Sequence, residues 1–159
     1  MNQSLVRILS TAAVAVLSHC PAFADSTPSA SAAPDTLAQA RAYVEARQWT
    51  AAIAELKRIN DPASADWNNL MGYSLRKSAS PDLEAAERHY NEALRIDPRH
   101  RGALEYSGEL HLMRGDLAAA EKRLAVLDKA CLFGCEEYTH LKKAVERFKA
   151  SGGKASTSQ

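Results

Sequence analysis

The sequence predicts an all-α fold built from repeated helix pairs. Alanine recurs at positions 34 residues apart, in Ala52, Ala86 and Ala120. A fixed period of this length is typical of repeat arrays, in which each unit buries its apolar face against its neighbours. Within each unit the apolar residues follow steps of three and four, as on one face of a helix. Three further sets keep the 34-residue period: Leu56, Tyr90 and Leu124; Ile59, Ala93 and Leu127; and Trp49, Leu83 and Leu117.

Residues 1–24 are expected to form a secretory signal peptide. Arg7 supplies a short basic region, an apolar run follows from Ile8 to Leu17, and Ala22-Phe23-Ala24 forms a small-x-small cleavage site. The apolar run is shorter than the roughly 20 residues that cross a bilayer, so cleavage is favoured over a retained anchor. Lipidation at Cys20 is a third option, which His19 disfavours. The sequence therefore predicts a periplasmic or secreted protein without a stable membrane anchor.

The mature chain is expected to carry no net charge. The full sequence has 20 Lys and Arg and 19 Asp and Glu, and the signal peptide contains one of the cations, leaving 19 of each sign. Both signs are interleaved along the predicted helices, which argues against a nucleic-acid-binding face or a polybasic membrane patch. Residues 25–36 and 150–159 lack large apolar side chains and are expected to be a disordered linker and tail.

The first predicted unit covers about residues 35–64. Ala40 and Tyr43 belong to a helix over about 35–47, and Ala52 and Leu56 belong to a helix over about 50–59. Pro62 follows the second helix and marks its end, because proline cannot continue a helix.

The second and third predicted units cover about residues 65–98 and 99–130. In the second, Asp82 is placed to cap a helix over about 82–96, which follows a helix over about 65–77. In the third, Asp116 is placed to cap a helix over about 117–129, after a helix over about 101–114. A turn over 131–135 then leads to a helix over about 136–149 whose inner face carries Leu141, Val145 and Phe148.

These units resemble the tetratricopeptide repeat (TPR), a 34-residue pair of helices with small residues where the helices cross. The third unit matches best, since Gly108, Gly115, Asp116, Ala120 and Leu124 stand at the spacing of the family. The resemblance implies a right-handed superhelical array of about three TPR units over residues 37–130, closed by a capping helix over 136–149. An unrelated helical bundle is the alternative.

The second unit departs from the pattern in two places. Gly72 and Ala86 are 14 residues apart, whereas Gly108 and Ala120 are 12 apart, and the two extra residues fall in the turn at 78–81. Trp67 also stands one position before the tryptophan of the family. The second helices nevertheless keep their 34-residue period.

In the TPR family the first helix of each unit lines a concave groove that binds another protein or an extended peptide. Glu105 and Glu109 stand where a C-terminal carboxylate clamp would need basic residues, so a clamp of that kind is not expected. A groove that is basic at one end and acidic at the other suits a zwitterionic or unfolded segment. The groove residues that the resemblance implies are Arg41, Asn69, Tyr73, Arg76, Glu105, Glu109 and Leu112.

Cys131 and Cys135 are the cysteines that remain after signal cleavage, and an even number in an exported protein predicts a disulfide. Two alternatives stay open, a redox thiol pair and a copper site that adds His140 to the two cysteines. Glu136 and Glu137 disfavour the redox reading, since nearby acids do not stabilise a thiolate. No cofactor and no metal are expected in the favoured reading.

The function expected from the sequence is that of a protein-binding adaptor or assembly scaffold. No Ser-His-Asp, paired-carboxylate or phosphate-loop arrangement is present, so no catalytic residues are expected. A thiol-based metal or redox protein is the alternative function. Self-association through the first unit is also an expectation, because Ala40, Tyr43 and Val44 have no preceding unit to cover them.

Overall fold

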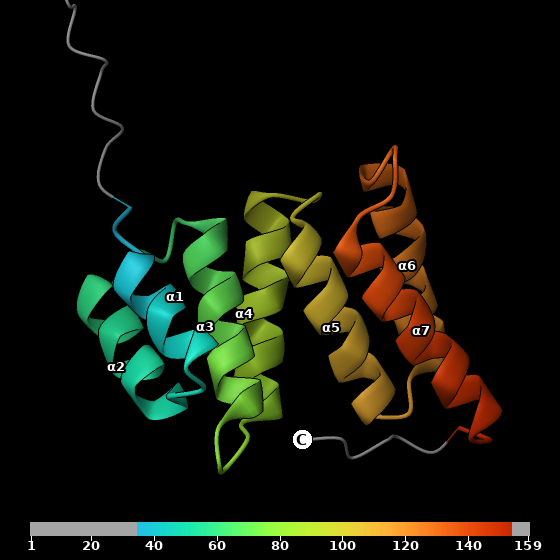
Figure 1. Ribbon diagram of the computed structural model, residues 1–159, viewed down its shortest axis with the longest axis horizontal. Helices are drawn as coiled ribbons and strands as arrows, with labels where there is room; N and C mark the ends of the chain where they lie inside the picture. The colour runs from blue at the N-terminus through green and yellow to red at the C-terminus, as the bar shows by residue number, and fades with distance from the viewer. Residues whose placement is uncertain (1–34, 154–159) are drawn as a thin grey trace, which may run out of the picture. The chain divides into compact units, whose positions relative to one another are not determined.

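The computed structural model describes residues 35–153, and this part of the chain is all-α, with seven helices and no strands (Figure 1). The predicted signal peptide, nearly all of the predicted linker and the last six residues of the predicted tail lie outside the described residues. Within residues 35–153, the helices are all too short or too polar to cross a membrane.

The predicted helices are confirmed, and their predicted bounds differ from the observed ones by three residues at most. In order along the chain they are α1 (Ala38–Glu45), α2 (Trp49–Ile59), α3 (Ala65–Lys77), α4 (Leu83–Ile96), α5 (Arg101–Met113), α6 (Leu117–Ala130) and α7 (Glu136–Ala150).

Side-chain caps fix the starts of several helices. The Oδ1 atom of Asp82 accepts a hydrogen bond from the backbone N–H of the third residue of α4 at 2.8 Å, and Asp116 does the same for α6 at 2.9 Å. Both caps were predicted, since a side-chain oxygen before a helix satisfies one of its free N–H groups. At α5 the cap is His100, whose Nδ1 accepts from the N–H of Ala103 at 3.1 Å.

Each helix packs on the next one or two helices along the chain (Figure 1). The most extensive contacts join α3 to α4 and α5 to α6, and α1–α3, α3–α5 and α5–α7 also touch. The apolar core accordingly falls into three clusters. One, around Leu56, joins α1, α2 and α3; a second, around Tyr90, joins α3, α4 and α5; and a third, around Leu104, joins α4 to α7.

Helix α7 closes the last of these clusters with the three residues that the sequence predicted. Leu141, Val145 and Phe148 are 0%, 4% and 7% exposed. Leu141 lies directly over Gly108 of α5, where an added Cβ would come within 2.6 Å of a leucine methyl group. The predicted tail starts at 150, but α7 includes that residue, and the N–H of Gly153 donates to the carbonyl of Phe148.

The prediction that Ala40 is uncovered in the first unit is wrong. Ala40 is fully buried, and Leu37 beside it is also buried, in the cluster that includes Leu56 and Trp67. The small side chain faces α2 and α3 because α1 crosses both helices closely. Val44 is partly buried against the same cluster. Of the three residues expected to be uncovered, Ala40 is therefore internal, whereas Tyr43 and Val44 are partly exposed.

Candidate binding groove

A groove of about 1000 Å³ extends over α3, α5, α7 and the turn between α1 and α2. Five of the seven residues that the sequence placed in a groove line it. Helix α3 contributes Tyr73 and Arg76, and α5 contributes Glu105, Glu109 and Leu112. The first helices of the second and third pairs, α3 and α5, thus supply two of its walls, and α7 supplies another.

The other two predicted groove residues, Arg41 and Asn69, do not line the groove. The Arg41 guanidinium instead donates to a carboxylate oxygen of Asp66 at 2.8 Å, between α1 and α3. Asn69 is only 9% exposed, and its amide nitrogen would lie 2.9 Å from a Cβ added to Gly102. The close approach of α3 and α5 at this glycine covers Asn69, so the residue supports packing there.

Three aromatic rings form a continuous ladder along the groove, which we call the aromatic ladder (Trp49, Tyr73 and Tyr106). The ring centroids of Trp49 and Tyr73 are 5.7 Å apart in an edge-to-face arrangement, and those of Tyr73 and Tyr106 are 4.4 Å apart. Trp49 was expected only as part of the repeat pattern, and Tyr106 was not among the predicted groove residues. Tyr106 follows Tyr73 by 33 residues, which is close to the repeat period. This spacing was the sequence signal that could have placed Tyr106 in the groove.

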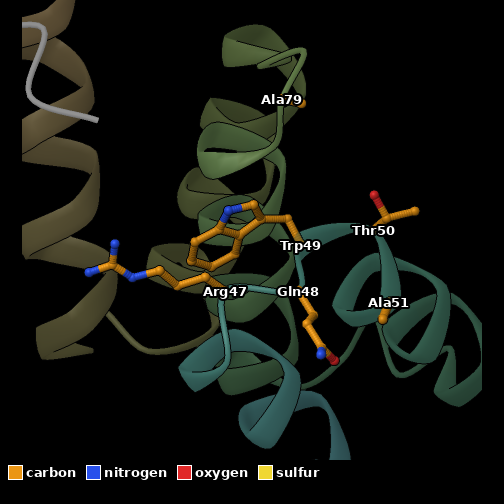
Figure 2. Close-up of a pocket in the computed structure, with 6 residues that line it drawn as sticks. All are labelled: Arg47, Gln48, Trp49, Thr50, Ala51 and Ala79. Carbon is orange, nitrogen blue, oxygen red and sulfur yellow. The ribbon is translucent and has the colours of Figure 1, made fainter.

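The turn between α1 and α2 brings a cation to one end of the ladder. Figure 2 shows the side chains of Arg47 and Trp49 extending in the same direction, away from Thr50. Both line the groove and also a smaller adjoining hollow of about 360 Å³. Arg47 has a left-handed backbone with φ of 56°, which lets the chain reverse between the two helices.

Arg76 is buried at the base of the groove and joins the ladder to α5. Its guanidinium carbon lies 5.5 Å from the Tyr73 ring centroid and 5.6 Å from that of Tyr106, and its Nη2 donates to Glu109 at 2.8 Å. The Tyr90 hydroxyl also faces the guanidinium, although no regular hydrogen bond forms at that hydroxyl or at Arg76 Nε. Burial favours the neutral form of Arg76, but Tyr90 and Glu109 outweigh it and raise the pKa of the guanidinium.

Glu105 is a buried carboxyl in the wall of the groove, with 5% of its surface exposed. Its Oε1 lies 3.1 Å from Nδ1 of His140 on α7. Burial is the main cause that raises the pKa of Glu105 to about 7; Glu109 adds to this effect and His140 opposes it. Near neutral pH the groove therefore holds a carboxyl group that is readily protonated.

The two carboxyl groups of the groove are paired, whereas three of its cations are not. Arg47, Lys77 and Arg147 line the groove, and none of them forms an ion pair with another residue of the described part. Glu109 is neutralised by Arg76, and Glu105 faces His140. The unpaired charge that the groove offers to a ligand is thus positive.

The predicted disulfide between Cys131 and Cys135 is confirmed, with the two Cα atoms 5.6 Å apart. Cys135 also caps α7, since its sulfur accepts from the N–H of Tyr138 at 3.4 Å. The turn that the disulfide closes exposes Leu132 by 80% and Phe133 by 100%, which the sequence did not predict. Among residues 35–153 no group of three His, Cys, Asp or Glu side chains is placed to hold a metal ion.

Comparison with known proteins finds no matching family model and no matching curated protein. The helix pairs and the groove are therefore the observations on which a function can be argued.

Proposed function

We propose that this protein is an exported TPR-type interaction module that holds a segment of another protein in its groove and serves as an adaptor or assembly scaffold. In this proposal α1–α2, α3–α4 and α5–α6 are the three repeat units of a right-handed superhelical array, and α7 caps it. The agreement between the 34-residue period and three successive helix pairs supports this assignment.

The aromatic ladder inside an open, cationic groove is the observation that carries the proposal. Tyrosine, tryptophan and arginine are enriched at protein interfaces, because they offer a large contact area together with polar atoms. Tyr73 and Tyr106 are only partly buried, so their remaining surface can contact a partner. The groove is also long enough to contact residues from the α1–α2 turn to α7, as an extended segment requires.

Site-specific photo-crosslinking in cells tests the proposal. A photoreactive phenylalanine analogue replaces Met113, which lines the groove and is 43% exposed, in one strain, and Arg88 on the exposed face of α4 in a matched control strain. We expect a discrete crosslinked protein from the groove position that is absent from the α4 position. Equal crosslinking at both positions, or none at the groove, would count against a protein-binding groove.

A further inference from the structure

We propose that the groove selects an acidic peptide segment in which carboxylate side chains alternate with aromatic or large apolar side chains. This inference rests on the proposed function and names the chemistry of the partner. It replaces the zwitterionic segment expected from the sequence.

The unpaired charges of the groove favour an acidic ligand. Arg47, Lys77 and Arg147 approach the groove from the α1–α2 turn, the end of α3 and α7. Because they form no ion pairs with described residues, a carboxylate from a ligand can pair with each of them without first breaking a contact. Such complementarity between a cationic groove and an acidic partner increases both the association rate and the specificity.

The aromatic ladder favours a ligand that carries apolar side chains as well as negative charge. Trp49, Tyr73 and Tyr106 line the same groove as the cations, and their ring edges and faces favour aromatic or large apolar partners. In an extended peptide successive side chains point to opposite sides. Alternation of acidic and apolar residues therefore gives the peptide one side that can contact the ladder and another that carries the carboxylates for the lining cations.

A uniform polyanion fits the groove less well than such a peptide. The part of the wall formed by Glu105 and Glu109 offers no unpaired cation, so a chain that carries a negative charge on every residue leaves some of its charges there without a partner. A peptide can place an uncharged side chain at those points. Single-stranded nucleic acid, which would also find cations and aromatic rings here, is disfavoured for this reason.

Fluorescence anisotropy with four labelled probes tests the inference on the purified full chain. The probes are a ten-residue peptide of alternating Glu and Phe, the same pattern with Lys for Glu, the same pattern with Ser for Phe, and a ten-nucleotide oligothymidine. The groove variant changes three lining residues: Arg47→Gln, Lys77→Gln and Arg147→Gln. The matched control variant removes the same number of charges from exposed positions outside the groove: Arg88→Gln, Lys122→Gln and Lys143→Gln.

We expect the Glu–Phe peptide to bind the wild type and the control variant alike and to bind the groove variant at least about tenfold more weakly. Raising NaCl from about 50 mM to about 500 mM is expected to weaken binding to the wild type more than to the groove variant. Circular dichroism checks that both variants remain folded.

Each of four results would overturn the inference. One is equal weakening in the control and groove variants, and another is binding of the Ser-containing peptide or of oligothymidine as tightly as the Glu–Phe peptide. The third is preferential binding of the Lys–Phe peptide in the groove, which would leave the proposed function standing. Failure of every probe overturns the inference alone if groove photo-crosslinking still captures a protein, and overturns both proposals if it does not.

Discussion

Replacement of Glu105 by Gln is expected to change how the stability of the fold depends on pH. The pKa of Glu105 is raised from 4.5 to about 7, mainly by burial. Below pH 4.5 the carboxyl is protonated in the folded and the unfolded chain alike. Between these two values only the folded chain keeps the proton, so the free energy of unfolding falls as the pH rises. Above the pKa of the folded chain this decrease in the free energy of unfolding is complete, because the folded chain then holds a buried carboxylate.

The structure sets the size of this effect. The two pKa values differ by about 2.5 pH units, and each unit corresponds to about 1.4 kcal/mol, which gives an upper bound of about 3 to 4 kcal/mol. The groove is open to water on one side, and water screens the carboxylate, so the bound must be reduced. We expect the free energy of unfolding to fall by about 1 to 2 kcal/mol between about pH 5 and about pH 8 because of this group.

Urea unfolding of the wild type and of Glu105→Gln across this pH range measures the effect. The variant should gain stability relative to the wild type as the pH rises, because Gln cannot ionise. His89 and His111 also make the stability depend on pH. Burial lowers the pKa of both imidazoles, so their contribution to the free energy of unfolding increases as the pH rises. These contributions cancel when the two proteins are compared. A stability difference that stays constant with pH, or that matches the difference given by Glu146→Gln at an exposed position of α7, would refute the reasoning.

Two further predictions concern packing and capping. Gly108→Ala should lower the free energy of unfolding by about 1 to 2 kcal/mol, since its methyl group would overlap Leu141. In a Leu141→Ala background the overlap is removed. The same change should then become stabilising, because alanine favours a helix over glycine by about 1 kcal/mol. Urea titrations of the wild type, the two single variants and the double variant measure this. If Gly108→Ala lowers the free energy of unfolding in both backgrounds, the prediction is contradicted. Asp116→Ala should cost about 1 kcal/mol through loss of the α6 cap, and an unchanged denaturation midpoint would show that this cap contributes nothing.

The features that could be predicted from the sequence depend on local chemistry. The caps at Asp82 and Asp116 and the inner face of α7 follow from residues within one or two turns of each other, so spacing along the chain reveals them. The disulfide between Cys131 and Cys135 is equally local. The 34-residue period extended this reasoning to the helix pairs, and the resemblance to the TPR implied most of the groove residues.

The features that could not be predicted depend on contacts between helices. Arg76 looks like an exposed position of α3, but it is buried because Tyr106 and Glu109 of α5 lie against its guanidinium. Asn69 is covered where Gly102 lets α5 approach α3. The spacing within one helix does not show how closely a neighbouring helix will approach, so the burial of Arg76 and of Asn69 could not be predicted.

The stepwise packing of the helices has a mechanical consequence for the groove. No helix among residues 35–153 touches one more than two places along the chain, so α1 and α2 are not in contact with α7. The groove nevertheless receives Trp49 from one end of the array and Phe148 from the other. A ligand that contacts both would join segments that otherwise open independently. Hydrogen exchange in α1 and in α7, which should differ in the free protein, would then slow together when the groove is filled.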